Sequence, residues 1–256
     1  MKTKLIILGC GSSIGVPRID GYWGNCRKNE KKNSRTRCSA IIIKGSNSIL
    51  IDTSPDLRSQ LLLNKIKNIS SVIFTHEHAD QTNGLFELRP FFWKNKKKIN
   101  VYSDLSTIKH LRRSQNYLFK KTISYNPIVK SNVIKSRFFL GKLNERVFFN
   151  TIKLKHGLIT SLAYIFEKTA YISDCNDLSI TQIKKLKNLK YLILDCLRFK
   201  KHPSHFNLEE SIYIHDRLKP KKTILTNLHY DLDYNYLLRH LPKGIIPAYD
   251  GIKINL

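Results

Sequence analysis

Short apolar runs recur along the whole chain, and most of them have the length of a β-strand. The run Ser71–Phe74 and the alternating segment Val147–Lys155 are typical of strands that pack against a core. Further strands are predicted at 4–8, 38–44, 48–52, 100–103, 161–166, 170–173, 191–195, 223–226 and 251–255. Amphipathic segments between them predict helices at 56–63, 104–118, 180–189, 208–218 and 234–241.

Both halves of the chain mix strands with helices, and no stretch rich in Gly, Ser or Pro separates them. We therefore expect one α/β domain over residues 1–256, with two sheets face to face and helices outside. The segment 119–144 follows neither period clearly. The polar, basic stretch 22–38 predicts a long loop, and loops of that length in compact domains usually carry function.

Polar side chains suited to metal binding follow several of the predicted strands. His76, His78 and Asp80 come directly after the strand at 71–74, and His156 and Asp174 each follow a later strand. Any one of them alone is more often a turn residue, but strand ends that meet at one edge of a sandwich bring distant side chains together. Imidazole and carboxylate ligands suit zinc, with manganese or iron as alternatives, at a site that keeps an open position.

Composition limits the class of protein. The 256 residues contain no apolar run of 18, so we expect no membrane span, and the N-terminal apolar stretch is too short for a signal peptide. Five cysteines without a CxxC pair favour reduced thiols and a cytoplasmic location over a disulfide framework.

The formal net charge of +26 invites a nucleic-acid interpretation. Lysine is spread along the whole chain, however, and only 94–98 and 219–222 form local clusters. We therefore favour a small anionic substrate over nucleic acid as the partner. The sequence leaves open whether the chain acts as a monomer or a homodimer.

The segment Thr75-His76-Glu77-His78-Ala79-Asp80 resembles the H-x-H-x-D-H signature of metallo-β-lactamase-fold hydrolases. Five further stretches resemble the phosphoribosyl cyclic phosphodiesterase group of that fold: 9–17, 23–26, 35–39, 50–58 and 202–205. The resemblance extends over nearly the full chain. It implies a four-layer αββα sandwich and hydrolysis of a small cyclic phosphodiester by a metal-activated water.

The resemblance also implies a first metal ion held by His76, His78 and His156, with Asp174 as a bridging ligand. Some members of the group carry a structural zinc on a cluster of cysteines near the N-terminus. Only Cys26 remains there in this chain, so we expect that zinc to be absent.

A second ion would be bound by Asp80 and the bridging carboxylate. The two imidazoles that complete this second site in the family are replaced here by Gln81 and Asn227. An amide oxygen binds zinc more weakly than imidazole does, so we expect one strongly bound ion and a second that is weak, a harder ion such as manganese, or absent. His229, two residues after Asn227, is an alternative ligand.

In catalysis we expect Asp80 to accept a proton from the attacking water and His205 to protonate the leaving oxygen. Arg37 or Arg58 would hold the phosphate, and Asp52 would orient a metal-binding imidazole or cap a turn. Two alternatives stay open. One is a catalytically reduced member that binds metal or RNA, and the other is a nuclease of the tRNA-processing type. The latter normally carries a substrate-gripping arm, and no long insertion rich in Gly and Pro is present here.

Overall fold

The computed structural model describes residues 1–256 and contains two seven-stranded sheets. The first is built from β1 (Thr3–Gly9), β2 (Ser39–Lys44), β3 (Asn47–Ile51), β4 (Ser71–Ile73), β5 (Ile99–Ser103), β6 (Val129–Val133) and β14 (Ile252–Asn255). The second is built from β7 (Arg137–Leu140), β8 (Val147–His156), β9 (Ile159–Phe166), β10 (Thr169–Ile172), β11 (Tyr191–Asp195), β12 (Lys222–Thr226) and β13 (Ile245–Pro247). Their orders are β14-β1-β2-β3-β4-β5-β6 and β13-β12-β11-β10-β9-β8-β7.

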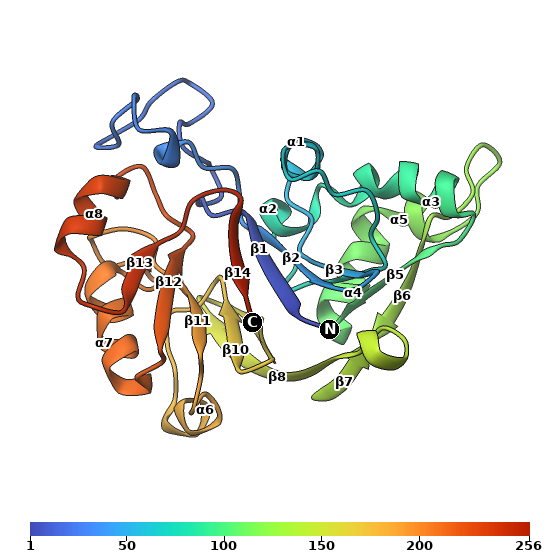
Figure 1. The fold of residues 1–256 in the computed structure, drawn as a ribbon. Helices are drawn as coiled ribbons and strands as arrows, with labels where there is room; N and C mark the ends of the chain where they lie inside the picture. Colours follow the sequence, from blue (N-terminus) through green and yellow to red (C-terminus); the bar gives the residue numbers. More distant parts are fainter.

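Helices cover the outer face of each sheet (Figure 1). On the first sheet they are α1 (Leu57–Leu63), α2 (Ala79–Thr82), α3 (Arg89–Asn95), α4 (Leu105–Ser114) and α5 (Asn116–Phe119). On the second they are α6 (Ile180–Lys185), α7 (Leu208–Leu218) and α8 (Tyr234–His240). Short 3-10 turns lie at Lys31–Asn33, Leu85–Leu88 and Leu143–Glu145. The predicted αββα architecture is confirmed.

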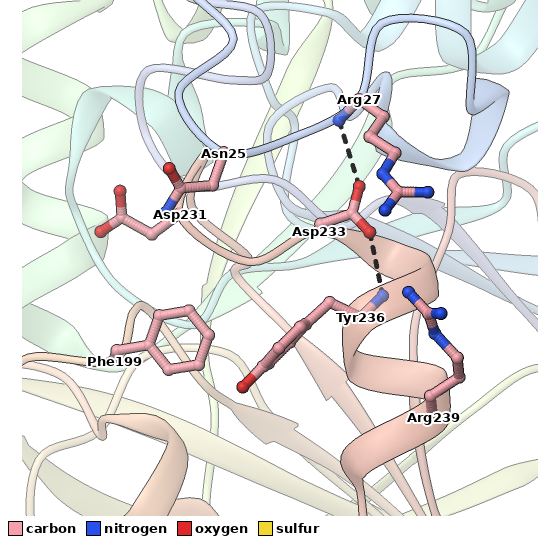
Figure 2. Close-up of a pocket in the computed structure, with 7 residues that line it drawn as sticks. All are labelled: Asn25, Arg27, Phe199, Asp231, Asp233, Tyr236 and Arg239. Atoms are coloured by element: carbon pink, nitrogen blue, oxygen red, sulfur yellow. Dashed lines mark hydrogen bonds between the residues drawn. The ribbon is translucent and has the colours of Figure 1, made fainter.

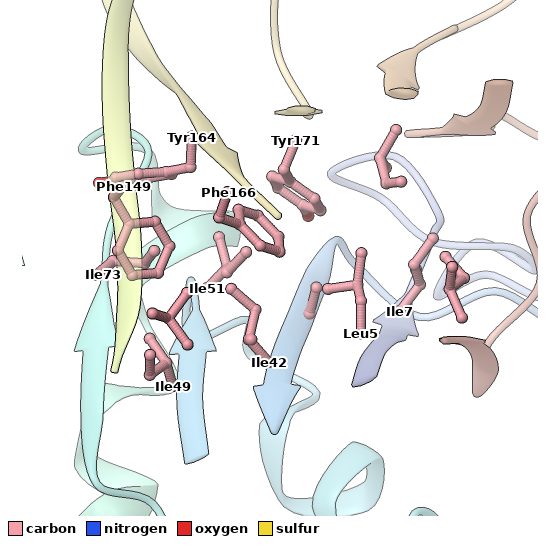
Figure 3. Packing of buried hydrophobic residues seen from close by; sticks show 14 of the residues in the cluster. Leu5, Ile7, Ile42, Ile49, Ile51, Ile73, Phe149, Tyr164, Phe166 and Tyr171 are labelled. Carbon is pink, nitrogen blue, oxygen red and sulfur yellow. The ribbon is translucent and has the colours of Figure 1, made fainter. Parts of the chain in front are cut away.

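Alternate residues of the central strands fill two different cores. Leu5 and Ile7 of β1 point between the sheets, where they join a cluster with Tyr164 and Phe166 of β9 (Figure 3). Ile6 and Leu8 point to the other face and pack under the helices of the first sheet. A strand covered on both faces needs apolar residues at every position, which explains the unbroken run at the start of the chain.

Most predicted elements are confirmed, and the exceptions lie at edges and breaks. The helix predicted at 104–118 is interrupted at Gln115, where α4 ends and α5 begins. Strands β6, β7 and β13 were not predicted. All three are edge or near-edge strands of three to five residues, partly exposed, so they lack the apolar alternation of an interior strand. The capping box that opens α7, between Asn207 and Glu210, is present as predicted.

The sheet topology explains why distant polar residues meet. Strands β10, β11 and β12 are neighbours and run parallel, so their carboxyl ends lie at one edge of the second sheet. The backbone of Leu162 in β9 donates a 2.9 Å hydrogen bond to the carbonyl of Thr75, just after β4. This contact brings the end of β4 against the same edge.

The long loop predicted at 22–38 is present and is part of a longer connection, 10–38, that lies above α8 (Figure 1). The buried guanidinium of Arg35 holds it in place, donating to the carbonyls of Leu232 at 2.7 Å and His229 at 3.3 Å. No helix is both long and apolar enough to cross a membrane, and all five cysteines are buried and unpaired.

Candidate active site

Three imidazoles converge at the edge where the two sheets meet. His76 and His78 follow β4, and His156 ends β8. The Nε2 atom of His76 lies 3.0 Å from Nδ1 of His78, and Nε2 of His156 lies 3.3 Å from the same atom. The ring centroids are 4.6 to 5.0 Å apart. We call these three residues the histidine triad.

A hydrogen-bonded chain fixes the ring of His76. Both oxygens of the buried Asp52 accept from Thr75, one from its backbone N–H and one from its hydroxyl, each at 2.8 Å. The hydroxyl oxygen of Thr75 lies 3.0 Å from Nδ1 of His76. Because the hydroxyl proton goes to Asp52, Nδ1 of His76 must donate to this oxygen, and the lone pair of Nε2 faces the triad. Asp52 therefore acts on the imidazole through Thr75 rather than directly.

A hydrogen bond also fixes the ring and the tautomer of His156. Its Nδ1 lies 2.7 Å from the backbone carbonyl of Ser204, which can only accept, so Nδ1 carries the proton and Nε2 is a lone-pair donor. Burial lowers the pKa of His76 to about 3 and lowers the pKa of His78 as well. His76 and His78 are thus held in the neutral form that imidazole ligands need.

The triad fits a divalent metal ion. Two nitrogens bound at about 2.0 to 2.1 Å in a tetrahedral arrangement are roughly 3.3 Å apart, close to the spacing seen here. The lone pairs of His76 and His156 both face Nδ1 of His78, so the three nitrogens can bind one cation together. The Oδ1 atom of Asp174, which follows β10, lies 3.9 Å from Nε2 of His156 and adds a carboxylate to the set.

The second half of the site contains Asp80, Gln81 and Asn227 around the other side of Asp174. The Nε2 group of Gln81 donates to Asp80 at 3.1 Å and lies 3.5 Å from Oδ2 of Asp174. Its amide oxygen is buried and has no hydrogen-bond partner. Burial, with the nearby Asp174 carboxylate adding to it, raises the pKa of Asp80 to about 6. Gln81 and Asn227, the two positions where the family pattern has histidine, thus both lie beside Asp174.

Asn227 donates its amide to the carbonyl of Ser173 at 3.1 Å and to Oδ1 of Asp195 at 3.0 Å. Its backbone φ is 62°, in the left-handed region. The amide is thus engaged with a carbonyl and a carboxylate that only accept. Where the family pattern has an imidazole ligand, this chain has a hydrogen-bond donor that ties together the ends of β10, β11 and β12.

His205 forms a dyad with Asp195, a fully buried residue at the end of β11 that was not predicted as part of the site. Its Nδ1 lies 2.9 Å from Oδ2 of Asp195 and 3.8 Å from Oδ1 of Asp174. Burial by itself lowers the pKa of His205, but the Asp195 carboxylate outweighs it and raises the pKa to about 9. Because Nδ1 donates to the carboxylate, Nε2 is the nitrogen left to exchange a proton.

His229 does not take the place of a missing ligand in this structure. Its Nδ1 lies 3.3 Å from a carboxylate oxygen of Asp231, at an angle that makes no hydrogen bond, and its ring packs on Tyr230. His229 lines a cavity that His78 and His156 also line.

The cavity beside the triad has a volume of about 290 Å³, and we call it the histidine cavity. Its lining residues come from loops at the ends of strands: Ser12, Ser13, Ile14, His78, Asp80, His156, Asp174, Leu197, Arg198, His202, Ser204, His205, Asn227 and His229. The glycine-rich segment after β1 thus forms one wall. The volume suits a small ligand rather than a large one.

The arginines predicted to hold phosphate do not line this cavity. Arg37 pairs with Asp56, its Nε 3.1 Å from Oδ2, and Arg58 is exposed on α1. Arg198 lines the cavity instead, with its guanidinium donating to the carbonyls of Lys200 at 3.2 Å and Lys201 at 3.0 Å. Neither Arg198 nor Asp195 belongs to a motif with a chemical signature. The only signal in the sequence was their place at the end of the strand 191–195, where other site residues also lie.

Comparisons with known proteins agree with this geometry. The protein-family model for the beta-lactamase superfamily domain matches residues 47–230 of the sequence. A crystal structure of a diphosphatase from the PhnP family is 30% identical, with a TM-score of 0.90, and the match covers 100% of this chain and 98% of that one. Fold and site define a protein of the metallo-β-lactamase fold. The chain belongs to the beta-lactamase superfamily and, within it, to the PhnP family.

More distant structures share the fold. Zn²⁺-bound PqqB from Methylobacterium extorquens is 16% identical with a TM-score of 0.79, covering 99% of this chain and 100% of that one. The short form of human tRNase Z is 15% identical with a TM-score of 0.70, covering 98% of each chain. A curated octanoyltransferase of Porphyromonas gingivalis is 31% identical over 98% of this chain and 51% of its own length. The chain therefore spans about half the length of that relative.

Proposed function

We propose that this protein is a metal-dependent phosphodiesterase that hydrolyses a small anionic phosphodiester in the histidine cavity. The observation that carries the proposal is the histidine triad. Its inner nitrogens converge at 3.0 and 3.3 Å, and outer hydrogen bonds hold two of the three rings as lone-pair donors. The diphosphatase relative adds a second argument, because its name assigns it to chemistry at a phosphorus–oxygen bond.

The residues that would hold the ion are His76, His78 and His156, with Asp174 as the carboxylate. When bound there, a divalent ion supplies Lewis acidity to the phosphate and lowers the pKa of a water molecule. Zinc fits three imidazoles and a carboxylate best, and manganese or iron are chemically compatible.

The other residues act on protons and on the charge of the substrate. Asp80, which lines the cavity, is placed to accept a proton from the attacking water. His205 keeps Nδ1 on Asp195, so Nε2 is free to protonate the leaving oxygen. Arg198 lies in the cavity wall, where its charge would stabilise the phosphate oxygens as they gain charge.

We further propose that the second metal position is reduced. The amide N–H groups of Gln81 and Asn227 point at carboxylates, and a donor cannot coordinate a cation. The unpartnered oxygen of Gln81 and the side-chain oxygen of Asn227 are the amide atoms left for a weak ligand role. One strongly held ion per chain is the expected composition.

The test combines elemental analysis with a substrate panel. The purified protein is dialysed against dilute zinc or manganese and assayed on a ribose cyclic phosphodiester, a 2′,3′-cyclic nucleotide, methyl p-nitrophenyl phosphate and a dinucleoside diphosphate. We expect hydrolysis of at least one phosphodiester, loss of activity after chelation and recovery with the metal. A metal-loaded protein that hydrolyses none of them contradicts the proposal. Cleavage of a tRNA precursor alone would instead support the nuclease alternative.

A further inference from the structure

A second cavity of about 460 Å³ lies between the long N-terminal loop and helix α8. It is lined by Asn25, Arg27, Phe199, Asp231, Asp233, Tyr236 and Arg239 (Figure 2). We call it the arginine cavity. Nothing in the proposed hydrolytic chemistry uses it.

The arginine cavity and the histidine cavity share one wall. Arg198 lines the histidine cavity and its neighbour Phe199 lines the arginine cavity. In the same way His229 lines the first and Asp231 the second. These two segments are joined, because the backbone of His229 donates a 2.9 Å hydrogen bond to the carbonyl of Leu197. A ligand that extends past this wall would reach both cavities.

The two arginines of the cavity have no acidic partner. Every ion pair within 4.0 Å in the molecule is made by other residues. The carboxylate of Asp233 between them is already occupied, by the backbone N–H of Arg27 at 3.1 Å and of Tyr236 at 2.9 Å and by the side chain of Asn33 at 2.7 Å. In Figure 2 both guanidinium groups lie on the same side of the view, beside Asp233. The Nε of Arg239 donates to the carbonyl of Asn235 at 3.2 Å. Two guanidinium groups without a carboxylate partner at one wall are suited to an anion such as phosphate.

Two aromatic rings form the other side of the cavity. Phe199 and Tyr236 are 40% and 42% exposed, with ring centroids 5.8 Å apart and planes at 85°. One face of Tyr236 is covered by His240, whose ring stacks on it with centroids 4.1 Å apart. Exposed rings of this kind bind nucleic-acid bases by stacking. Asn25 and Asp231 supply a donor and acceptors for the polar edge of a base.

The cavity is firmly built although one wall is a loop. The buried Asn33 accepts from the backbone N–H of Tyr234 at 2.7 Å, so the loop is attached to the first turn of α8. A side chain at Gly24 would collide with the ring of Tyr230 at 2.3 Å, which shows how closely loop and wall approach. Together with the buried Arg35, these contacts hold Arg27 opposite α8 before any ligand binds.

We propose that the arginine cavity binds a nucleotide unit of the substrate, with its base against Phe199 and Tyr236 and its phosphate on Arg27 and Arg239. The phosphodiester to be cleaved is the next link of the same small molecule and lies in the histidine cavity. This assignment rests on the proposed phosphodiesterase function and names its substrate class. The ligand is therefore a small molecule with two phosphorus centres on either side of one nucleoside.

Three p-nitrophenyl phosphodiesters with the same leaving group test the proposal. They are methyl p-nitrophenyl phosphate, thymidine 5′-(p-nitrophenyl phosphate), and its 3′-phosphorylated form. The second adds a nucleoside and the third adds the second phosphate. We expect kcat/KM of the metal-loaded protein to rise about tenfold at each step, as one base stack and one phosphate contact each justify. Equal values for all three would overturn the proposal.

Variants assign each step to its residues. Phe199→Ala should reduce about tenfold the ratio of kcat/KM for the thymidine diester to kcat/KM for the methyl diester. Arg239→Ala should reduce about tenfold the ratio of kcat/KM for the 3′-phosphorylated diester to kcat/KM for the thymidine diester. Arg112→Ala is the matched control, since Arg112 is an exposed arginine on α4 that lines neither cavity. If Arg239→Ala and Arg112→Ala alter the preference for the 3′-phosphate equally, the arginine cavity does not bind it.

A binding measurement separates failure of this site from failure of the proposed function. Calorimetric titration with thymidine 3′-phosphate needs no turnover, so it applies even if no substrate is hydrolysed. We expect it to bind at least tenfold more tightly than inorganic phosphate and to lose that advantage in Arg239→Ala. Equal affinities overturn the proposal. A long oligothymidylate that competes much better than the mononucleotide would contradict the assignment to a small molecule.

Discussion

On one side of the site His76, His78 and His156 each turn a ring nitrogen toward a common point. On the other side the amides of Gln81 and Asn227 turn N–H donors toward carboxylates. The first arrangement offers ring nitrogens to a cation, and the second satisfies its charges by hydrogen bonds alone. The two halves of the site are thus built at the ends of the same strands. They differ in how well their side chains suit a metal ion.

The contrast between the two halves also gives Asp174 and Asp195 different roles. Asp174 faces the triad, whereas Asp195 is held by Asn227 and by the N–H of His205. In the second half, the Asp195 carboxylate orients the proton-carrying His205 and is itself held by Asn227, which stands where the family pattern has a histidine ligand. Four changes sharpen or break this comparison, and they are given from the largest expected effect to the smallest.

Removal of one triad imidazole should have the largest effect. His76→Ala leaves two imidazoles and a carboxylate, so we expect it to lose most bound metal and at least 100-fold in kcat/KM. Elemental analysis and the phosphodiester assay measure both. His110→Ala, a change on α4 outside both cavities, is the control. A His76→Ala protein with wild-type metal content and activity would remove His76 from the proposed ligand set.

Loss of the dyad histidine should reduce catalysis without reducing metal content. His205→Gln is expected to lower kcat about 100-fold for an alkyl leaving group, because an alkoxide needs a proton as it departs. The loss should be only a few-fold for p-nitrophenolate, which is a stable anion. Asp195→Asn should follow the same pattern in weaker form. Equal losses for both leaving groups would argue against an acid role.

The chain from Asp52 through Thr75 to His76 should tune metal affinity. Thr75→Val keeps the shape of the side chain but removes both of its hydroxyl contacts, so we expect metal affinity to fall about tenfold. Competition with a fluorescent chelator measures it. Thr151→Val removes a threonine contact on β8, to the carbonyl of Ser136, and should have no effect on affinity. Unchanged affinity in Thr75→Val would mean that the triad holds its geometry without this contact.

Restoring imidazoles to the second half should change only the stoichiometry. Gln81→His combined with Asn227→His is expected to raise the metal content from about one ion per chain toward two, because it replaces donors by lone pairs beside Asp80 and Asp174. The left-handed backbone at Asn227 costs a histidine about 1 kcal/mol, so Gln81→His alone is the better-folded partial variant. Two tightly bound zinc ions in the unmodified protein would refute the reduced second site.

The sequence by itself determined the architecture and the triad. The unbroken apolar run of β1 and the alternation in β8 report burial directly, since each side chain faces a core or a helix layer. His76 and His78 stand two residues apart after a strand, so local geometry alone directs them to one place. The edge strands β6 and β13 escaped prediction, because an edge exposes enough of a strand to remove the pattern.

Only the tertiary structure decided what the remaining polar residues do. Arg37 and Arg198 are the same residue type, yet one pairs with Asp56 and the other lines the histidine cavity. Asp195 became a partner of His205 because neighbouring parallel strands end together, and no local pattern encodes that neighbourhood. Ring orientation likewise depends on acceptors far away in the chain, such as the Ser204 carbonyl 48 residues from His156. Such contacts are properties of packing, so they exist only once both sheets have come together.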